Sequence, residues 1–230
     1  MFVYGFHPVR EVLRRRPADV VRVLVSARQG RRANEVRQAC GAHGVRVEES
    51  SPAALTALVG GVHNGFVAEL AASAETVAGG DEELVVLLED VQDPRNLGAV
   101  LRVCEGAGVG RVLLRDRGST AITPTVSKAS AGASEWLPVD RIPNPAQAIR
   151  RYRDEGYWIY GAAGEGEPVW DVDLRGKLVL CFGGEEKGLR RLARESCDGL
   201  VGLPMRGRIE SLNLATAVSA ILYEALRQRR

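Results

Sequence analysis

The C-terminal block of the chain, from Leu178 to Glu224, constrains the fold most. Two apolar runs, Leu178–Phe182 and Leu200–Leu203, each lead into a loop rich in glycine and polar residues, and a strongly apolar helix follows from Ser211. Buried parallel strands are typically continuous apolar runs, and α/β sheets bind ligands beyond the carboxyl ends of their strands. The block therefore predicts a parallel sheet with a ligand site at one edge.

The rest of the chain alternates strands and helices in two sections. Residues 1–72 alternate short elements, which predicts a small α/β domain, and residues 84–230 alternate longer ones, which predicts an α/β domain with a mostly parallel sheet. The stretch 73–83 is small and polar with a glycine pair, so we interpret it as a linker. In the second section we expect a first strand at Leu84–Leu88 and a first helix from Asn96 to about Gly106. We also expect strands at Val112–Leu114 and Tyr157–Ala162, the second of them followed by a glycine-rich loop to Gly166.

Composition excludes several classes of protein. No apolar run approaches the 18 residues of a membrane span, and the N-terminus has no secretory signal, so we expect a cytoplasmic protein. The chain has four cysteines without C-x-x-C spacing and only three histidines, so we expect no metal site. The positive charge is concentrated in residues 1–72, where ten arginines face six acids; base composition of the genome explains much of this, but arginine also suits phosphate groups.

The loop after the first strand of the second domain carries polar residues. It runs from Asp90 to Ala99, and the helix that follows brings in Arg102. Asn96 and Arg102 are six residues apart, which places them about 120° from each other on an ideal helix. A capping asparagine with a solvated arginine would explain the same pattern, so the pair alone leaves two interpretations open.

The two loops of the C-terminal block favour a binding site. In the first, glycines at 183, 184 and 188 permit close backbone approach, and Glu185 offers a hydrogen-bond acceptor. A simple strand-to-helix turn is the alternative, but the polar residues at 204–205 and 211–213 favour a site. The run Gly106–Gly110 is no dinucleotide fingerprint, because it follows a helix and precedes a strand.

The polar segments contain no general base with a pKa near neutrality. All three histidines lie in the N-terminal third, and neither a Ser/His/Asp set nor a Walker lysine loop is present. Backbone amides, asparagine, serine, glutamate and arginine can bind and orient a ligand. These residue types fit a reaction in which an activated cofactor, rather than a side-chain base, supplies most of the chemical reactivity.

Three motifs in order resemble those of the SpoU class of SPOUT RNA 2′-O-ribose methyltransferases (the TrmH family). Asn96–Arg102 matches N-x-G-A-x-x-R, Gly183–Leu189 matches G-x-E-x-x-G-[LM], and Leu203–Asn213 is similar to the family's I-P-M-x-G-x-x-x-S-L-N stretch. The segment SKASAGASEWLPV also looks like a family motif. The departures are Glu186, where many members have glycine, and Leu203 in place of isoleucine. The opening YGFHPVREVL is similar to the substrate-binding domain of the branch that methylates a guanosine of 23S rRNA.

The resemblance implies a C-terminal SPOUT domain with a deep trefoil knot, a small N-terminal α/β domain that binds substrate, S-adenosylmethionine (S-adenosyl-L-methionine) as cofactor and a homodimer formed by the knotted domains. It implies catalytic roles for Arg102, Asn96, Glu185, Ser211 and Asn213. The implied cofactor-binding residues are Gly183, Gly184, Gly188, Leu203, Met205, Gly207, Ser211 and Leu212.

The implied reaction is in-line attack of a ribose 2′-OH of 23S rRNA on the cofactor's methyl group. The family nominates Arg102 to activate the hydroxyl, but arginine stays protonated, so its role is open between base and electrostatic clamp. Arginines 10, 14, 31 and 32 are candidates for RNA contacts. The alternatives are a tRNA or resistance-type rRNA methyltransferase, a non-catalytic RNA-binding assembly factor and, on pattern alone, a nicotinamide-dependent dehydrogenase.

Overall fold

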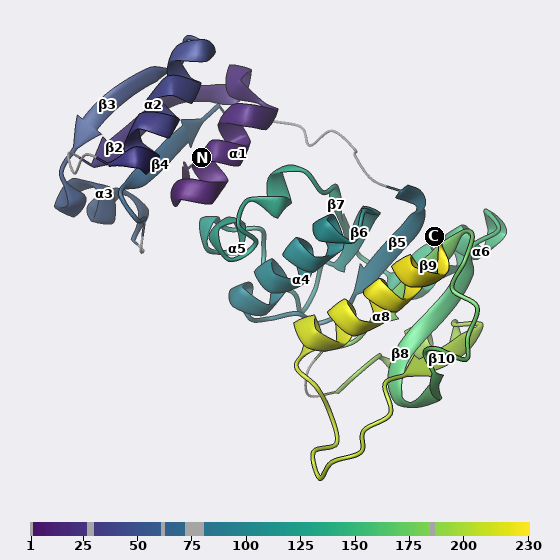
Figure 1. Ribbon diagram of the computed structural model, residues 1–230. Helices are drawn as coiled ribbons and strands as arrows, with labels where there is room; N and C mark the ends of the chain where they lie inside the picture. Colours follow the sequence, from purple (N-terminus) through teal and green to yellow (C-terminus); the bar gives the residue numbers. More distant parts are fainter. Residues whose placement is uncertain (1, 27–29, 61–62, 72–80, 185–186) are drawn as a thin grey trace.

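The computed structural model describes residues 2–26, 30–60, 63–71, 81–184 and 187–230. They form two α/β domains, each with its own sheet (Figure 1). The first sheet has the order β1-β4-β2-β3, and the second has the order β10-β8-β9-β5-β6-β7. No helix in the described part of the chain is long and apolar enough to cross a membrane.

The N-terminal domain is a mixed four-stranded sheet covered on both faces. β2 pairs parallel with β3 and antiparallel with β4. Helices α1 and α2 cover one face around Val9, Val23 and Val36, and Leu55 of α3 fills the other. The elements are β1 (Phe2–Tyr4), α1 (Phe6–Arg15), η1 (Pro17–Asp19), β2 (Val20–Ser26), α2 (Arg31–Ala42), β3 (Arg46–Ser50), α3 (Pro52–Val59) and β4 (Phe66–Leu70).

The C-terminal domain is a six-stranded sheet in which every pairing is parallel, as the apolar runs predict. Its first half comprises β5 (Asp81–Leu88), α4 (Pro94–Gly106), β6 (Val109–Arg115), α5 (Pro124–Ala129), η2 (Ala133–Glu135) and β7 (Val139–Ile142). Its second half comprises α6 (Pro145–Asp154), β8 (Trp158–Pro168), β9 (Leu178–Phe182), α7 (Arg191–Glu195), β10 (Gly199–Gly202) and α8 (Leu214–Gln228).

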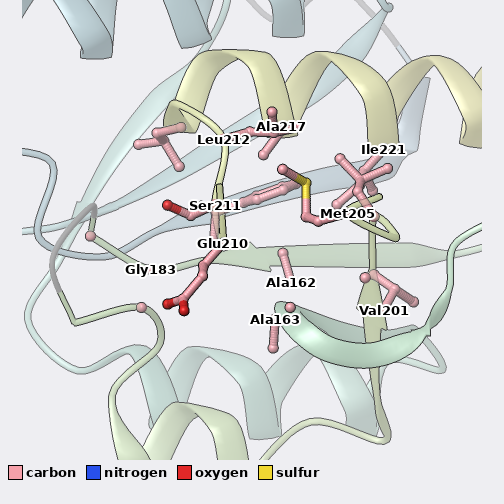
Figure 2. Close-up of a pocket in the computed structure, with 17 residues that line it drawn as sticks. Ala162, Ala163, Gly183, Val201, Met205, Glu210, Ser211, Leu212, Ala217 and Ile221 are labelled. Carbon is pink, nitrogen blue, oxygen red and sulfur yellow. The ribbon is translucent and has the colours of Figure 1, made fainter. Parts of the chain in front are cut away.

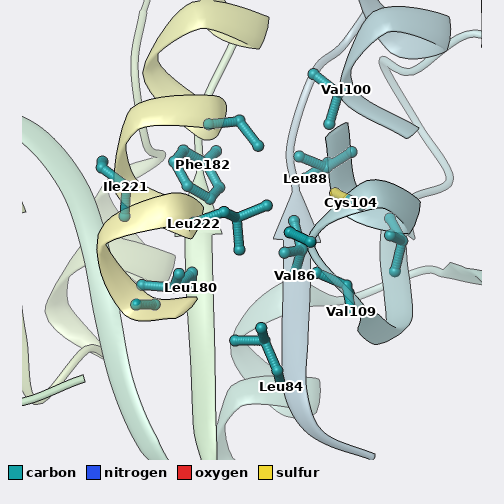
Figure 3. Packing of buried hydrophobic residues seen from close by; sticks show 14 of the residues in the cluster. Leu84, Val86, Leu88, Val100, Cys104, Val109, Leu180, Phe182, Ile221 and Leu222 are labelled. Carbon is teal, nitrogen blue, oxygen red and sulfur yellow. The ribbon is translucent and has the colours of Figure 1, made fainter. Parts of the chain in front are cut away.

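Helices α4 and α8 share one face of this sheet. Figure 3 shows Leu222 of α8 beside Phe182 of β9, and Cys104 of α4 beside Leu88 of β5. These side chains are buried, and full burial of an aliphatic or aromatic side chain stabilises a fold by about 1.5–3 kcal/mol. Helices α6 and α7 cover the other face through residues such as Ile149. The packing brings the N-terminal ends of α4 and α8 to the same edge of the sheet.

Three predicted boundaries were wrong. β5 begins at Asp81, so residues 81–83 of the predicted linker belong to the sheet, and residues 72–80 lie outside the described part. α4 begins at Pro94 because Asp93 caps it, accepting a hydrogen bond from the amide of Arg95 at 2.7 Å. β8 continues to Pro168 through a stretch expected to be a glycine-rich loop. A Cβ at Gly166 would lie 2.5 Å from the backbone of Val201, so glycine there lets β10 approach.

Candidate active site

A cavity of about 280 Å³ lies where three segments of the C-terminal domain meet (Figure 2). The segments are residues 162–164 of β8, the turn after β9, and the stretch from β10 to the start of α8. Ala217 and Ile221 of α8 complete the lining. Among the lining residues of the described chain, only Glu210 and Ser211 have polar side chains, and Figure 2 shows both. The cavity is therefore mostly apolar side chain and glycine backbone.

The turn after β9 needs glycine at its start. A Cβ at Gly183 would lie 1.8 Å from the carbonyl carbon of Gly188, which no side chain can tolerate. The amide of Gly188 donates to the carbonyl of Gly184 at 2.9 Å, and Gly188 itself has φ +59°. These residues close a tight turn whose backbone borders the cavity.

Seven of the eight predicted cofactor contacts line this cavity: Gly183, Gly184, Gly188, Leu203, Met205, Ser211 and Leu212. Gly207 does not line it, because it lies in the exposed loop, where a Cβ would meet no atom within 4 Å. The side chains of Glu210, Ala217 and Ile221 were missed. Glu210 precedes the third motif's serine, and the two α8 residues are one turn apart on one face, a spacing that also fits an ordinary core helix.

The predicted residues Asn96 and Asn213 meet in the structure. The Asn213 side-chain amide donates to Oδ1 of Asn96 at 3.2 Å, and Oδ1 of Asn213 caps α8 by accepting from Ala215 at 2.9 Å. Asn213, not Asn96, is the capping asparagine. The pair therefore joins the beginnings of α4 and α8, which come from motifs more than a hundred residues apart.

A second hollow of about 370 Å³ adjoins the cavity through Gly184. It contains Asn96 and is lined further by Asp90, Val91, Gln92, Asp93, Gly118, Lys187 and Arg190. The described chain places Ser211 in the first cavity and Asn96 in the second, with Asn213 bonded to Asn96. Glu185, between Gly184 and Lys187, lies outside the described residues, as does Glu186.

Two carboxylates that directly follow β5, those of Glu89 and Asp90, are held differently. Glu89 is buried, and this burial raises the pKa of its carboxyl although it accepts the amide of Arg190 at 3.0 Å. Burial also acts to raise the pKa of Asp90, but hydrogen bonding to Arg190 at 2.7 Å and the charge of Arg115 outweigh it and lower that pKa. Asp90 therefore stays ionised and fixes both arginines at the end of β5.

Arg102 does not line either space. It is exposed on α4 and faces a third hollow, of about 400 Å³, together with Glu11 of α1 and Trp136. Within the described chain we find no hydrogen bond or ion pair of its guanidinium. One chain therefore brings together Asn96, Asn213 and Ser211 but leaves Arg102 apart from them.

The arginines predicted to contact RNA are partly engaged within the protein. Arg10 forms ion pairs with Glu11 at 2.8 Å and with Glu35 at 3.5 Å, and Arg32 lies over the ring of Phe6 at 5.1 Å. Arg14 lies over Trp136 of the other domain at 5.7 Å. Arg31 remains an exposed candidate at the start of α2.

The parallel sheet, the glycine turn and the paired asparagines agree with the expected SpoU-class methyltransferase, and comparison with protein families establishes that class. The model of the SpoU rRNA Methylase family matches residues 83–223, and the model for RNA 2′-O ribose methyltransferase substrate binding matches residues 2–76. The chain therefore belongs to the SpoU rRNA Methylase family.

Among individual relatives, the chain is 40% identical to the 23S rRNA (guanosine-2′-O-)-methyltransferase RlmB of Xanthomonas axonopodis pv. citri, over 99% of this chain and 96% of that one.

Solved structures agree with the family. The SpoU methyltransferase AviRb from Streptomyces viridochromogenes, in complex with AdoMet, is 26% identical with a TM-score of 0.81, covering 99% of this chain and 90% of that one. The TrmH/SpoU tRNA modifying enzyme of A. aeolicus is also 26% identical, with a TM-score of 0.59, but covers 65% of this chain and 76% of its own.

Proposed function

We propose that the protein transfers a methyl group from S-adenosylmethionine to the ribose 2′-OH of a guanosine in 23S rRNA, in the cytoplasm. The observation that carries this proposal is the 40% identity to a 23S rRNA guanosine methyltransferase over 99% of the chain. The similarity includes the N-terminal domain, whereas the tRNA-modifying neighbour covers 65% of the chain. The paired Asn96 and Asn213 argue against a non-catalytic assembly factor.

The cavity beside the glycine turn fits the proposed cofactor. Apolar side chains such as Leu212 and Ile221 suit the adenine ring and the methionyl chain, while the backbone at Gly183 and Gly184 offers polar groups for orientation. Glu210 adds a carboxylate, which favours a cationic ligand. When bound, S-adenosylmethionine would supply a methyl group activated by its sulfonium.

The protein's own residues would position the ribose. We place the target nucleotide in the second hollow, because it adjoins the cavity at Gly184 and contains Asn96. The Asn96–Asn213 hydrogen bond fixes both amides, and Ser211 stands on the cavity side. We retain Glu185 as a proposed catalytic residue. Alignment of the hydroxyl with the methyl group would supply much of the acceleration.

Arg102 would stabilise the oxygen as it loses its proton. Arginine as a residue type is a poor general base, so we propose that Arg102 acts as an electrostatic clamp, with the hydroxyl proton passing to water. Because Arg102 faces away from the cavity of its own chain, we propose that it serves the cavity of a second copy. This requires the homodimer that the family resemblance implies.

Exposed apolar side chains near the cavity support such a dimer. Ile209 is 72% exposed, and Leu212 and Met205 are also exposed. Apolar groups gathered around one site commonly mark an interface. We further propose that residues 203–213, which pass the glycine turn before entering α8, form the trefoil knot. Residues 1–72 would hold RNA, and residues 84–230 would carry the reaction.

The test of the function is transfer of labelled methyl groups from S-adenosylmethionine to purified 23S rRNA, 16S rRNA and tRNA, each lacking methylation. We expect label in 23S rRNA. Label confined to tRNA would support the tRNA alternative and contradict the proposal.

A further inference from the structure

The contact between the two domains is specific. Helix α1 lies against the segment of α5 and η2, residues 124–136, which we call the docking segment (Figure 1). Tyr4 and Thr125 share a hydrogen bond at 3.2 Å, and the indole of Trp136 donates to Glu11 at 3.1 Å. The guanidinium of Arg15 lies over the Trp136 ring at 5.1 Å.

Gly132 allows this approach. It has φ +91°, and a Cβ there would lie 3.0 Å from the side chain of Glu11 and 3.2 Å from the Cα of Pro8. Both values are tighter than ordinary contact, so a larger residue would push α1 away. The shape of the docking segment is thus matched to the substrate-binding domain.

A buried ion pair lies at the centre of the contact. Oε2 of Glu135 accepts from Arg16 Nε at 3.1 Å and Nη2 at 2.5 Å. The side chains are only 5% and 14% exposed, respectively. Within its own domain, Glu135 also accepts the Ser127 hydroxyl at 3.3 Å, which orients the carboxylate, and Arg16 lies 3.6 Å from Asp19.

The second partners of this pair, Ser127 for Glu135 and Asp19 for Arg16, affect the free energy of docking. A buried ion pair gains little net stability because both charges lose water, but it penalises arrangements in which either charge is left unpaired. Here each charge keeps a partner in its own domain if the domains separate. The pair therefore selects one docked orientation while leaving the contact reversible.

The docking segment also packs against α4, the helix that carries Asn96. A Cβ at Gly98 of α4 would lie 2.4 Å from the Cβ of Ala129 and 2.9 Å from the carbonyl oxygen of Val126, so α5 packs directly on α4. Helix α4 carries Asn96 of the candidate site. A fixed orientation of α1 on the docking segment is therefore a fixed orientation toward that site.

We propose that Glu135 is a positioning residue: through its ion pair with Arg16 it holds the substrate-binding domain in the one orientation that delivers RNA to the second hollow. The effect of docking on RNA use rests on the proposed methyl transfer, whereas the docking itself can be measured without RNA. Loss of the pair should weaken RNA use and leave cofactor binding unchanged.

The test uses Trp136 as a native probe. Trp158 and Trp170 are 59% and 54% exposed, so their replacement by phenylalanine leaves the fluorescence of Trp136 alone. In this background, Arg16→Gln should raise acrylamide quenching of Trp136 toward that of an exposed indole. Arg16 is preferred over Glu135 for this readout because Glu135 adjoins the probe in sequence.

The kinetic arm compares Arg16→Gln, Glu135→Gln and the double variant. Each should raise KM for rRNA about tenfold, with kcat and the cofactor Kd unchanged, and the double variant should be no worse than either single one. Arg22→Gln is the matched control, since the ion pairs of Arg22 among the described residues are with Glu48 and Glu69 of its own domain. It should change neither readout.

Several results would overturn the proposal. Unchanged Trp136 quenching in Arg16→Gln would show that the pair does not set docking, whatever happens to KM. Increased quenching with unchanged KM would show that docking does not serve RNA, and additive effects in the double variant would show that the residues act separately. If the wild-type protein methylates no RNA, the proposed function fails, and the quenching result still decides the docking.

Discussion

At the scale of single residues, Gly183 is the position where the smallest change should have a large effect. Gly183→Ala places a methyl group where the backbone of Gly188 lies, so the turn must open and the cavity must change shape. Overpacking of this kind costs about 1–3 kcal/mol, so we expect cofactor affinity to fall about ten- to a hundredfold by calorimetry.

The control for this prediction is Gly41→Ala on α2, where the added methyl meets no atom within 4 Å. It should bind the cofactor as the wild type does. Wild-type affinity in Gly183→Ala would mean that the turn does not shape the cofactor site.

Substitution of Arg102 tests the methyl-transfer step rather than cofactor binding. Because it lines no part of the cavity, Arg102→Ala should leave cofactor affinity intact, while loss of the charge facing the developing oxyanion should lower kcat about a hundred- to a thousandfold. Arg102→Lys, which keeps the charge but not the guanidinium geometry, should retain part of the activity. Turnover like that of the wild type in Arg102→Ala would remove this residue from the mechanism.

The motif residues were predicted from the sequence because their order and spacing are characteristic. The structure joins Asn96 to Asn213 by a hydrogen bond and places Ser211 in the adjoining cavity. The position of Arg102 could not be predicted, since a six-residue spacing gives an angle on an ideal helix but not the side of the sheet that the helix occupies. Glu210 was missed because a single acidic residue in a loop has no pattern of its own.

At the scale of elements, the carboxylate of Glu224 organises the hydrogen bonds at the C-terminal end of α8. Glu224 accepts from Arg227 at 2.8 Å and from Gln228 at 2.8 Å, and Gln228 in turn accepts the amide of Leu174 at 2.9 Å. These hydrogen bonds lower the pKa of Glu224 to about 2. A lowered folded-state pKa means that the ionised group stabilises the fold above its ordinary pKa.

Glu224→Gln should therefore lower the Tm at pH 7, by about 2 °C. The difference from the wild type should shrink as the pH falls below about 4.5 and approach zero only below about 2, because only there is the carboxylate protonated in both the folded and the unfolded state. Thermal melts between pH 7 and pH 2 measure this. Glu195→Gln, on an exposed ion pair with Arg191, should have no effect, and a constant difference at every pH would refute the assignment.

Sequence patterns predicted the elements better than their ends. The buried strands β5, β6 and β9 were expected because short continuous apolar runs typically form buried strands of a parallel sheet. The continuation of β8 to Pro168 was missed because its glycines suggest a loop, whereas Gly166 makes room for the neighbouring backbone of Val201. β1, at three residues, is too short for any periodicity.

At the scale of the whole molecule, the proposed homodimer makes a prediction that one chain cannot. Mixing Arg102→Ala with a cofactor-site variant such as Gly183→Ala should restore part of the activity that both lack. Mixed dimers would contain one intact cavity served by one intact Arg102. No gain on mixing, with exchange of subunits verified by sedimentation, would place Arg102 at the cavity of its own chain.

Domain organisation was foreseeable from the two sections of strand and helix alternation, but the docking of the domains was not. The segment around Gly132 is rich in small residues, which on pattern alone also fits ordinary helix packing. Its match to α1 depends on contacts between residues more than a hundred positions apart, such as Arg16 and Glu135. Such pairings leave no trace in local periodicity.

The most direct test of the account is the identity of the methylated nucleoside. After reaction of unmethylated 23S rRNA with labelled S-adenosylmethionine, complete digestion and mass spectrometry should yield labelled 2′-O-methylguanosine from one position. Label on a base, on another nucleoside, or only in tRNA would contradict the proposed ribose methylation of a 23S rRNA guanosine.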